Sequence, residues 1–312
     1  MGVFVFLPLV LPLTAWPIAR LAEHRLHPRM ATRLLSAAAA VLGLCSSLCL
    51  ALLAIVGTAQ LPGNPLPDAW ADPEVRAAVP HDEVVGKAAV AALAAAAASC
   101  AALLLRHVRV RRRTARALRG LPSTQVAVLP DELPYAHTLP GRGGAGRVLV
   151  STGMLAGLTP GERRVLFAHE RAHLAGRHHR HLLLAGLAAR ANPFLRPLRT
   201  AVAYTVERWA DEDAARAVGD RRITARAVAK AALVSRPTPA PALAGLAAEP
   251  GPVPRRVAAL LGPAPAVRAW PPLFTTVGMA VWTAAAGAVV SAMSSANSAV
   301  TMFLILRAAT PL

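Results

Sequence analysis

The sequence predicts a mainly α-helical, polytopic membrane protein with about four transmembrane helices and a cytosolic α+β domain that holds a small sheet. Three observations support this fold class. Hydrophobic residues make up 55% of the 312-residue chain and charged residues only 16%, whereas about a quarter of the residues in an ordinary soluble domain are charged. The apolar residues gather in long runs, and a segment between the third and fourth runs mixes strand and helix patterns. A disordered chain is excluded, because disorder requires low hydrophobicity.

Four apolar runs predict the transmembrane helices, at about residues 3–19, 34–57, 88–105 and 273–293. The clearest run, 34–57, would form a helix about 36 Å long, enough for a hydrocarbon core of about 30 Å. The first run contains three prolines, which kink a membrane helix without preventing it from spanning. We therefore expect residues 1–106 to form an N-terminal membrane region with three spans. Residues 273–312 predict a fourth span and a short external tail, in which 299–306 is too short to cross alone.

The basic residues predict the orientation in the membrane. Lys and Arg number 34 against 16 Asp and Glu, and they gather in loop 20–33 and in a run of arginines that starts at Arg106. Loop 58–86 is mostly acidic. Since Lys and Arg favour the cytosolic side, we expect a multi-pass protein of the plasma membrane with its N-terminus outside. The arginine run is interpreted as a contact with the lipid bilayer. No nucleic-acid-binding motif accompanies it, so we expect no direct contact with nucleic acid.

Residues 107–272 predict one cytosolic domain. Within it, 125–129 and 147–151 have the composition of short strands. Thr159 is a suitable N-cap residue, and Pro160 suits the first position of a helix. A second helix is expected at about 197–218, because Gly219 is a helix-ending residue.

The clearest chemical pattern is the segment His169-Glu170-Arg171-Ala172-His173. Residues four apart lie on one face of a helix, so His169 and His173 can both direct a ring nitrogen at one metal ion. Glu170 is offset by about 100° and can reach a water molecule beside that ion. Two imidazoles and a carboxylate in this spacing are typical of zinc hydrolases.

A catalytic zinc site needs a third protein ligand, and two candidates exist. His179 completes a longer histidine pattern, but that class of site also needs a downstream methionine turn, and no methionine lies between His179 and the fourth apolar run. His178, His179 and His181 are otherwise expected at a solvated helix end. The other candidate is Glu207, with Asp211 four residues later on the same helix face. There Asp211 would orient a histidine ligand.

The two motifs, H-E-R-A-H and E-R-W-A-D, resemble those of the gluzincin membrane peptidases. This group includes the heat-shock membrane protease HtpX, the CAAX prenyl protease and the BlaR/MecR-type sensor metallopeptidases. Three spans, a cytosolic zinc domain and a fourth span resemble the BlaR/MecR type most. The expected departure from that type is that no extracellular penicillin-binding domain follows the fourth span. It also lacks the His-Pro that many relatives carry before the late arginine of the zinc domain, here in Arg255-Arg256.

The resemblance implies a membrane zinc metalloendopeptidase with one Zn²⁺ ion. His169, His173 and Glu207 would hold the metal, Asp211 would support a ligand, and Glu170 would be the catalytic base. We expect Val148, Leu149 and Val150 to form an edge strand that binds an extended substrate. The expected partner is a protein or peptide substrate, with a cytosolic repressor in signal transduction as one option. The alternative is a membrane signalling or scaffold protein whose zinc site is only structural. The sequence leaves the oligomeric state open.

Overall fold

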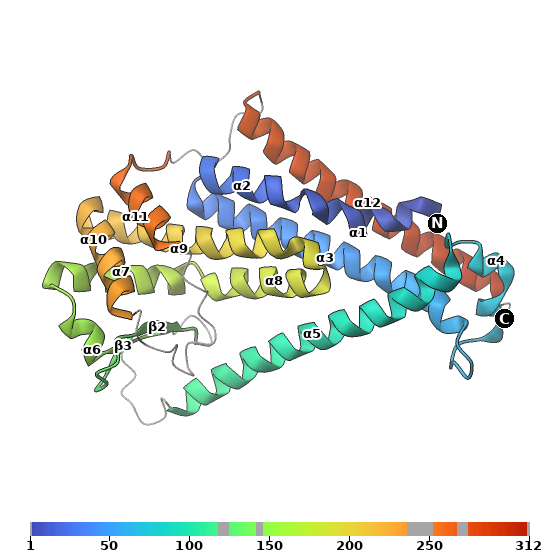
Figure 1. The fold of residues 1–312 in the computed structure, drawn as a ribbon, viewed down its shortest axis with the longest axis horizontal. Helices are drawn as coiled ribbons and strands as arrows, with labels where there is room; N and C mark the ends of the chain where they lie inside the picture. The colour runs from blue at the N-terminus through green and yellow to red at the C-terminus, as the bar shows by residue number, and fades with distance from the viewer. Residues whose placement is uncertain (1, 118–124, 142–145, 236–251, 267–273, 311–312) are drawn as a thin grey trace.

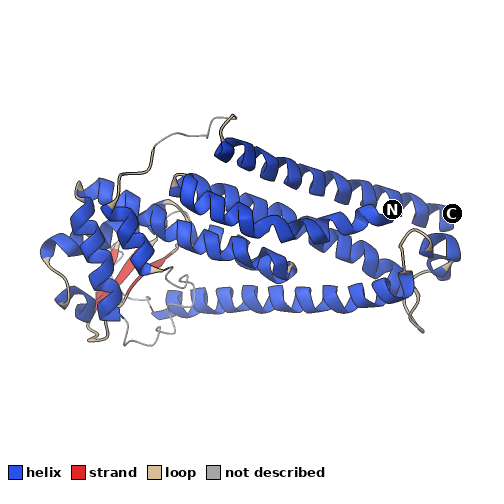
Figure 2. Ribbon diagram, turned by 45° about the horizontal axis from the view of Figure 1, so that its top comes forward, coloured by secondary structure: helices blue, strands red, loops and turns tan. Residues whose placement is uncertain are grey.

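A computed structural model describes residues 2–117, 125–141, 146–235, 252–266 and 274–310. These residues are mainly helical. Figure 2 shows long helices along most of the molecule and one small sheet among shorter helices at one end. The mainly α-helical fold class with a small sheet is therefore confirmed.

Four helical segments are long and apolar enough to cross a membrane: Phe4–Arg25, Pro28–Ala59, Asp82–Arg113 and Val277–Ala309. The first is broken into η1 (Gly2–Phe6), α1 (Leu7–Val10), η2 (Leu11–Thr14) and α2 (Ala15–Arg25). Its prolines explain the breaks, because proline removes a backbone donor and crowds the preceding turn. The other three segments belong to the unbroken helices α3 (Pro28–Ala59), α5 (Asp82–Ala117) and α12 (Thr276–Ala309). Between α3 and α5 lie the short η3 (Asp68–Ala71) and α4 (Pro73–Arg76).

Helix α12 is longer than the apolar pattern predicts. It continues through the Ser/Asn-rich residues 294–298, so 299–306 prolongs the fourth candidate span and does not stand alone. Serine is tolerated here because its hydroxyl bonds back to the preceding turn. The Ser295 hydroxyl donates to the Ser291 carbonyl at 2.9 Å.

The sheet contains β1 (Val126–Leu129), β2 (Ala136–Leu139) and β3 (Arg147–Ser151) in the spatial order β1-β3-β2. Strand β3 pairs in parallel with β1 and antiparallel with β2. The two predicted strands exist, but the expectation that Val148, Leu149 and Val150 form an edge strand is wrong. Both sides of β3 already carry a neighbouring strand, and the free edges of the described sheet belong to β1 and β2.

The remaining described helices are α6 (Thr152–Ala156), α7 (Pro160–Ala175), α8 (His178–Ala191), η5 (Pro193–Leu195), α9 (Arg196–Val218), α10 (Arg221–Ser235) and α11 (Val253–Leu261), of which α6 and α7 contact the sheet. Helix α7 begins where Thr159 and Pro160 predict. Helix α9 ends at Gly219, whose φ of 78° is left-handed, a conformation that favours glycine. Both predicted helix boundaries are confirmed.

Helix α8, η5 and the first half of α9, residues 178–206, form a hairpin that packs along α3 among the candidate spans (Figure 1). Near its base, the Thr32 hydroxyl donates to the Thr205 hydroxyl at 3.0 Å. At its tip, the Asn192 amide donates to Ser46 at 3.0 Å. A helix rises 1.5 Å per residue, so the tip lies about 18 Å beyond Leu34, where the uncharged part of α3 begins. The hairpin thus reaches about halfway along that apolar stretch.

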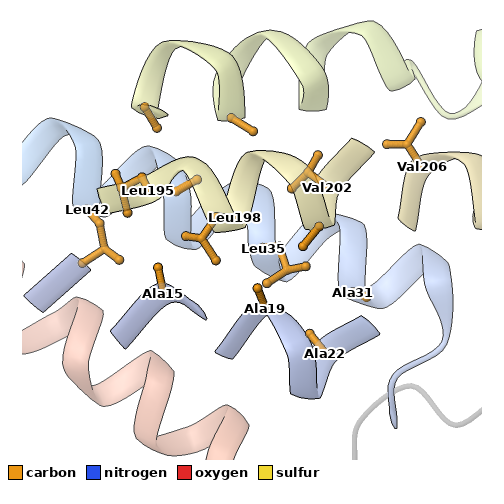
Figure 3. Close-up of a cluster of buried hydrophobic side chains, with 14 residues drawn as sticks. Ala15, Ala19, Ala22, Ala31, Leu35, Leu42, Leu195, Leu198, Val202 and Val206 are labelled. Atoms are coloured by element: carbon orange, nitrogen blue, oxygen red, sulfur yellow. The ribbon is translucent and has the colours of Figure 1, made fainter. Parts of the chain in front are cut away.

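Small and aliphatic side chains hold the hairpin in place. Figure 3 shows Leu195 of η5 and Leu198, Val202 and Val206 of α9 in one buried cluster with Leu35 of α3 and several alanines of α2 and α3. An added Cβ at Gly43 of α3 would approach the Ala188 backbone to 3.1 Å, so glycine permits close contact of the two helices. The packing holds the two ends of the hairpin, and hence the start of α8 and the middle of α9, in fixed positions.

Candidate metal centre

The first part of the site lies on α7, whose start is defined by a reciprocal cap. The Glu162 backbone N–H donates to the Thr159 hydroxyl at 3.4 Å, and the Thr159 N–H donates to the Glu162 carboxylate at 2.8 Å. This capping box satisfies two donors that a helix start otherwise leaves without partners. Farther along α7, His169 and His173 lie one turn apart and are both largely buried. The local sequence thereby fixes both imidazoles on one helix face.

The second part of the site comes from α9, which packs against α7 through small side chains. Val165, Ala214 and Ala227 are buried at the junction of α7, α9 and α10. This close packing places the Glu207 carboxylate beside the two imidazoles. The distances are 3.6 Å from His169 Nε2 to Glu207 Oε2 and 3.5 Å from His173 Nε2 to Glu207 Oε1. The two Nε2 atoms are 3.1 Å apart.

These three side chains fit a zinc ion. Nitrogen and oxygen ligands lie about 2.0–2.2 Å from zinc in tetrahedral geometry, which puts neighbouring ligand atoms about 3.3–3.6 Å apart. The three separations lie in or close to that interval. Two histidines and one carboxylate are also a donor set of catalytic zinc sites. Among the described residues, His169, His173 and Glu207 form the one group of three or more that could hold a metal ion.

Asp211 and Arg256 support the group from behind. Asp211, which is fully buried, lies 3.2 Å from His169 Nδ1. Arg256 of α11 donates to the two Asp211 oxygens at 2.8 and 2.6 Å and lies 3.0 Å from Glu207 Oε2. Burial opposes ionisation of Glu207, but the charge of Arg256 and the neighbouring His173 and His169 together outweigh it and keep the Glu207 pKa below its ordinary range. The same arginine lowers the pKa of Asp211. Both carboxylates are therefore ionised, as metal ligation and its support require.

His173 has a different support. Its Nδ1 lies 2.9 Å from Nδ1 of His178, the first residue of α8. The His178 ring is 1% exposed and packs on Trp209 with ring centroids 4.5 Å apart. Burial lowers the pKa of His178 to about 2, so its ring is neutral and can accept a hydrogen bond from His173. The expectation that His178 lies at a solvated helix end is therefore wrong.

Glu170 lies on α7 beside this group and is only 8% exposed. Burial raises its pKa to about 7. A carboxyl group with a pKa near neutrality can both take up and release a proton under physiological conditions. His179, in contrast, is partly buried on α8 and is not a member of the converging group. The structure thus favours Glu207 over His179 as the third ligand.

Sequence reasoning missed two residues of this site, His178 and Arg256. The spacing of His178 from His173 is five, which does not by itself place two side chains on one helix face. In the structure Gly176 ends α7, and Arg177, with a φ of 49°, turns the chain into α8. Arg256 lies 45 residues after Asp211 on a separate helix. The sequence contains the adjacent pair Arg255-Arg256, but no local pattern indicates which of the two arginines faces the site.

The family model of peptidase family M48 matches residues 105–194. The matched segment runs from the end of α5 through the sheet, α7 and α8, and it contains His169, Glu170 and His173. Glu207, Asp211 and Arg256 lie beyond it. No curated protein and no solved structure matches the chain. The match supports a metallopeptidase, and the four apolar helices support a membrane protein.

Proposed function

We propose that the chain is a membrane-embedded zinc metalloendopeptidase with its active site at the cytosolic end of the spans. The convergence of His169 Nε2, His173 Nε2 and the Glu207 carboxylate carries this proposal. Peptidase family M48, whose model matches residues 105–194, supports the same activity. The three residues are assigned as ligands of one Zn²⁺ ion, and Asp211 and His178 orient the two histidines.

Glu170 is the proposed general base. A zinc ion in this site would lower the pKa of water toward 7 and polarise the carbonyl of a peptide bond. Glu170 takes a proton from the attacking water and later delivers it to the nitrogen of the leaving amine. Its burial supports this role, because the neutral and ionised forms of the carboxyl are then close in free energy near pH 7.

An extended substrate is proposed to pair with β2, not with β3. Strand β2 is an edge of the described sheet, and it lies against α7, which carries the site. An exposed strand edge binds a peptide through backbone hydrogen bonds. The register places Ala136 opposite Val150 and Leu139 opposite Arg147. Val148, Leu149 and Val150 therefore pair with one edge of β2, and the other edge of β2 is the proposed binding edge for the substrate.

The substrate is proposed to be a protein or peptide, with a cytosolic repressor in a signalling pathway as the specific candidate. The cytosolic orientation rests on the arginines at the sheet end of α5, at the end of α2 and at the start of α3. Comparison of the cytosolic proteins of cells that carry the wild type with those of cells that carry Glu170→Gln would identify the substrate. A repressor that stays intact only in the variant is the expected result.

The catalytic assignment is tested with purified Glu170→Gln and Glu207→Gln. Because Glu170 is not a ligand, Glu170→Gln should keep its zinc and its melting temperature while peptide cleavage falls at least about 100-fold. Glu207→Gln removes a charged ligand, so zinc content should fall together with cleavage. A Glu170→Gln protein with bound zinc, normal melting and full activity would refute the mechanism. Zinc content without cleavage in the wild type would favour the scaffold with a structural zinc site.

A further inference from the structure

Two cavities adjoin at Leu26, and they differ sharply in chemistry. The first lies among α2, α3 and α12, has a volume of about 270 Å³, and is lined only by apolar side chains, including Leu21, Ala38, Ala284 and Ala288. In Figures 1 and 2 the start of α12 leans away from α2 at this place. An apolar cavity of about 150 Å³ already admits a hydrocarbon ligand such as benzene. This larger cavity lies within candidate spans, where acyl chains are the surrounding solvent.

The second cavity, of about 330 Å³, is polar and lies where α2 ends and α3 begins, against α9 and α11. Its charged lining residues are Glu23, Arg208 and Arg255, together with His24. Arg255 lies 3.0 Å from Glu23 and stacks on Tyr204 at 4.3 Å. Leu26 lines both cavities, so an apolar chamber and a polar chamber meet at one side chain.

The charges around the polar cavity do not balance. Arg208 is 8% exposed, and its Nη2 donates to Glu212 at 2.8 Å, while Nη1 is buried and has no hydrogen-bond partner among the described residues. Glu212 also pairs with Arg221. Three arginines (Arg208, Arg221 and Arg255) thus share two carboxylates (Glu212 and Glu23), which leaves one positive charge. A buried cation without a full set of partners is costly, so an anionic group in the cavity would stabilise the protein.

We infer that the two cavities bind one phospholipid with a net negative headgroup. An acyl chain occupies the apolar cavity, and the headgroup phosphate occupies the polar cavity beside Arg208 and Arg255. Arginine suits this role because its planar donors match phosphate oxygens. An anionic headgroup is favoured over a zwitterionic one, since an ammonium group would meet the surplus positive charge. The bound lipid would tie α2 and α12 to α9 and α11, the helices that carry Glu207 and Arg256.

The acyl-chain part of the inference is tested by filling the apolar cavity. Ala284→Phe places a large ring into the cavity, and the matched control Ala286→Phe adds the same ring to the same helix at an exposed position outside the lining. The full-length protein is purified in detergent, mixed with equal amounts of phosphatidylglycerol and phosphatidylcholine, and examined by native mass spectrometry. The wild type and Ala286→Phe should each retain one phosphatidylglycerol, and Ala284→Phe at least fivefold less.

The headgroup part is tested with Arg208→Gln and the matched control Arg199→Gln, an exposed arginine of the same helix outside the polar cavity. Arg208→Gln should lower the preference for phosphatidylglycerol over phosphatidylcholine at least fivefold, and Arg199→Gln should leave it unchanged.

Equal retention of the two lipids by the wild type and by all variants would overturn the inference. A dimer of the wild type that carries no lipid would assign the apolar cavity to a second copy of the chain and would overturn the inference as well. Circular dichroism shows which variants fold, and either folded cavity variant suffices for the test. Because lipid retention is measured without proteolysis, its failure is distinct from failure of the proposed function.

Discussion

At the scale of single residues, the site has two parts. One part is a set of motifs that can be recognised in the sequence, and the other is a set of supporting side chains that only the fold brings close to them. His169, Glu170 and His173 follow from helical spacing on one helix. Glu207 and Asp211 share a face of another. Both patterns are local, so sequence reasoning could identify all five residues as candidates. His178 and Arg256 reach the site through a sharp turn and a separate helix, and their roles depend on tertiary packing that no spacing rule contains.

Arg256 is predicted to stabilise the site because it is the charged partner of two buried carboxylates. Arg256→Gln leaves Asp211 buried and without its bidentate partner, and loss of one member of such a pair costs about 3–5 kcal/mol. We expect a lower melting temperature and weaker zinc retention, measured by thermal unfolding and metal analysis. Arg256→Lys keeps the charge but not the paired donors. Its melting temperature and zinc retention should therefore lie between those of the wild type and those of Arg256→Gln.

The neighbouring Arg255 is the matched control for this prediction. Its side chain is 37% exposed, and it pairs with Glu23 away from the metal group. Its partner Glu23 is 8% exposed, and Arg255 also stacks on Tyr204, so Arg255→Gln should lower the free energy of unfolding, but by less than the about 3–5 kcal/mol expected for Arg256→Gln. If Arg255→Gln and Arg256→Gln destabilise the protein equally, Arg256 has no special role in the site.

At the scale of elements, helix ends were predictable and strand order was not. Thr159, Pro160 and Gly219 carry the boundaries of α7 and α9 in their own backbone chemistry. Strand β2 escaped prediction because its four residues, which include His137 and Thr138, lack a clear alternating pattern. Without β2, the sequence predicts β3 as an edge strand. The order of strands depends on which backbones pair across the fold, and a segment's composition does not contain that information.

The capping box of α7 is predicted to stabilise the helix that carries the histidines. Thr159→Ala removes the cap acceptor, which typically costs about 1 kcal/mol. Thermal or denaturant unfolding should show this loss, while zinc content at saturating metal should stay unchanged, because the cap lies ten residues before His169. A loss of stability far below 0.5 kcal/mol, the low end of about 0.5–2 for caps, would show that tertiary packing alone holds this helix start.

The same cap predicts a pH dependence. Burial opposes ionisation of Glu162, but its hydrogen bonds to Thr159 and its contact with Lys230 at 3.2 Å outweigh this and lower the Glu162 pKa below 4.5. A carboxyl group with a lowered folded-state pKa stabilises the protein above its unfolded pKa, and this stabilisation is lost as the pH falls through the folded pKa. Glu162→Gln should therefore be less stable than the wild type at pH 7. The difference should shrink below about pH 4, and a constant difference from pH 7 to 3 would contradict the assignment.

At the scale of the whole molecule, hydropathy predicts the four spans, because each is a long uncharged run. It does not predict the hairpin of residues 178–206, since Arg190, Arg196 and Arg199 interrupt its apolar pattern. The sequence pattern assigns these residues to the domain 107–272, and the fold packs them along α3. Arg190 donates to Ser99 of α5 at 3.3 Å, which shows one way in which such a charge is accommodated. The candidate metal centre and the candidate spans therefore pack together.

The orientation is predicted from the charges of the loops. A reporter that is active only outside the cell should be active when fused after residue 70, in the acidic connection between α3 and α5. It should be silent when fused after residue 120, beyond the arginine run. A reporter that is active only inside serves as the control and should give the opposite pattern. If both reporters reverse, the active site faces outward and a cytosolic substrate is ruled out.

The depth of the hairpin gives the last prediction. Phe194 lies at the tip and is 52% exposed, and the neighbouring Asn192 bonds to Ser46 near the middle of the apolar stretch of α3. In a background without the three native cysteines, we compare Phe194→Cys with Arg222→Cys, an exposed position on α10.

Thiols react with maleimides as thiolates, and a low-dielectric surrounding disfavours the charged form. In inverted membrane vesicles, an impermeant maleimide should label Arg222→Cys readily and Phe194→Cys at least about tenfold more slowly. After solubilisation in denaturant the two rates should become equal, which shows that both thiols are intact. Equal labelling in intact vesicles would place the hairpin tip in water and refute its insertion among the spans.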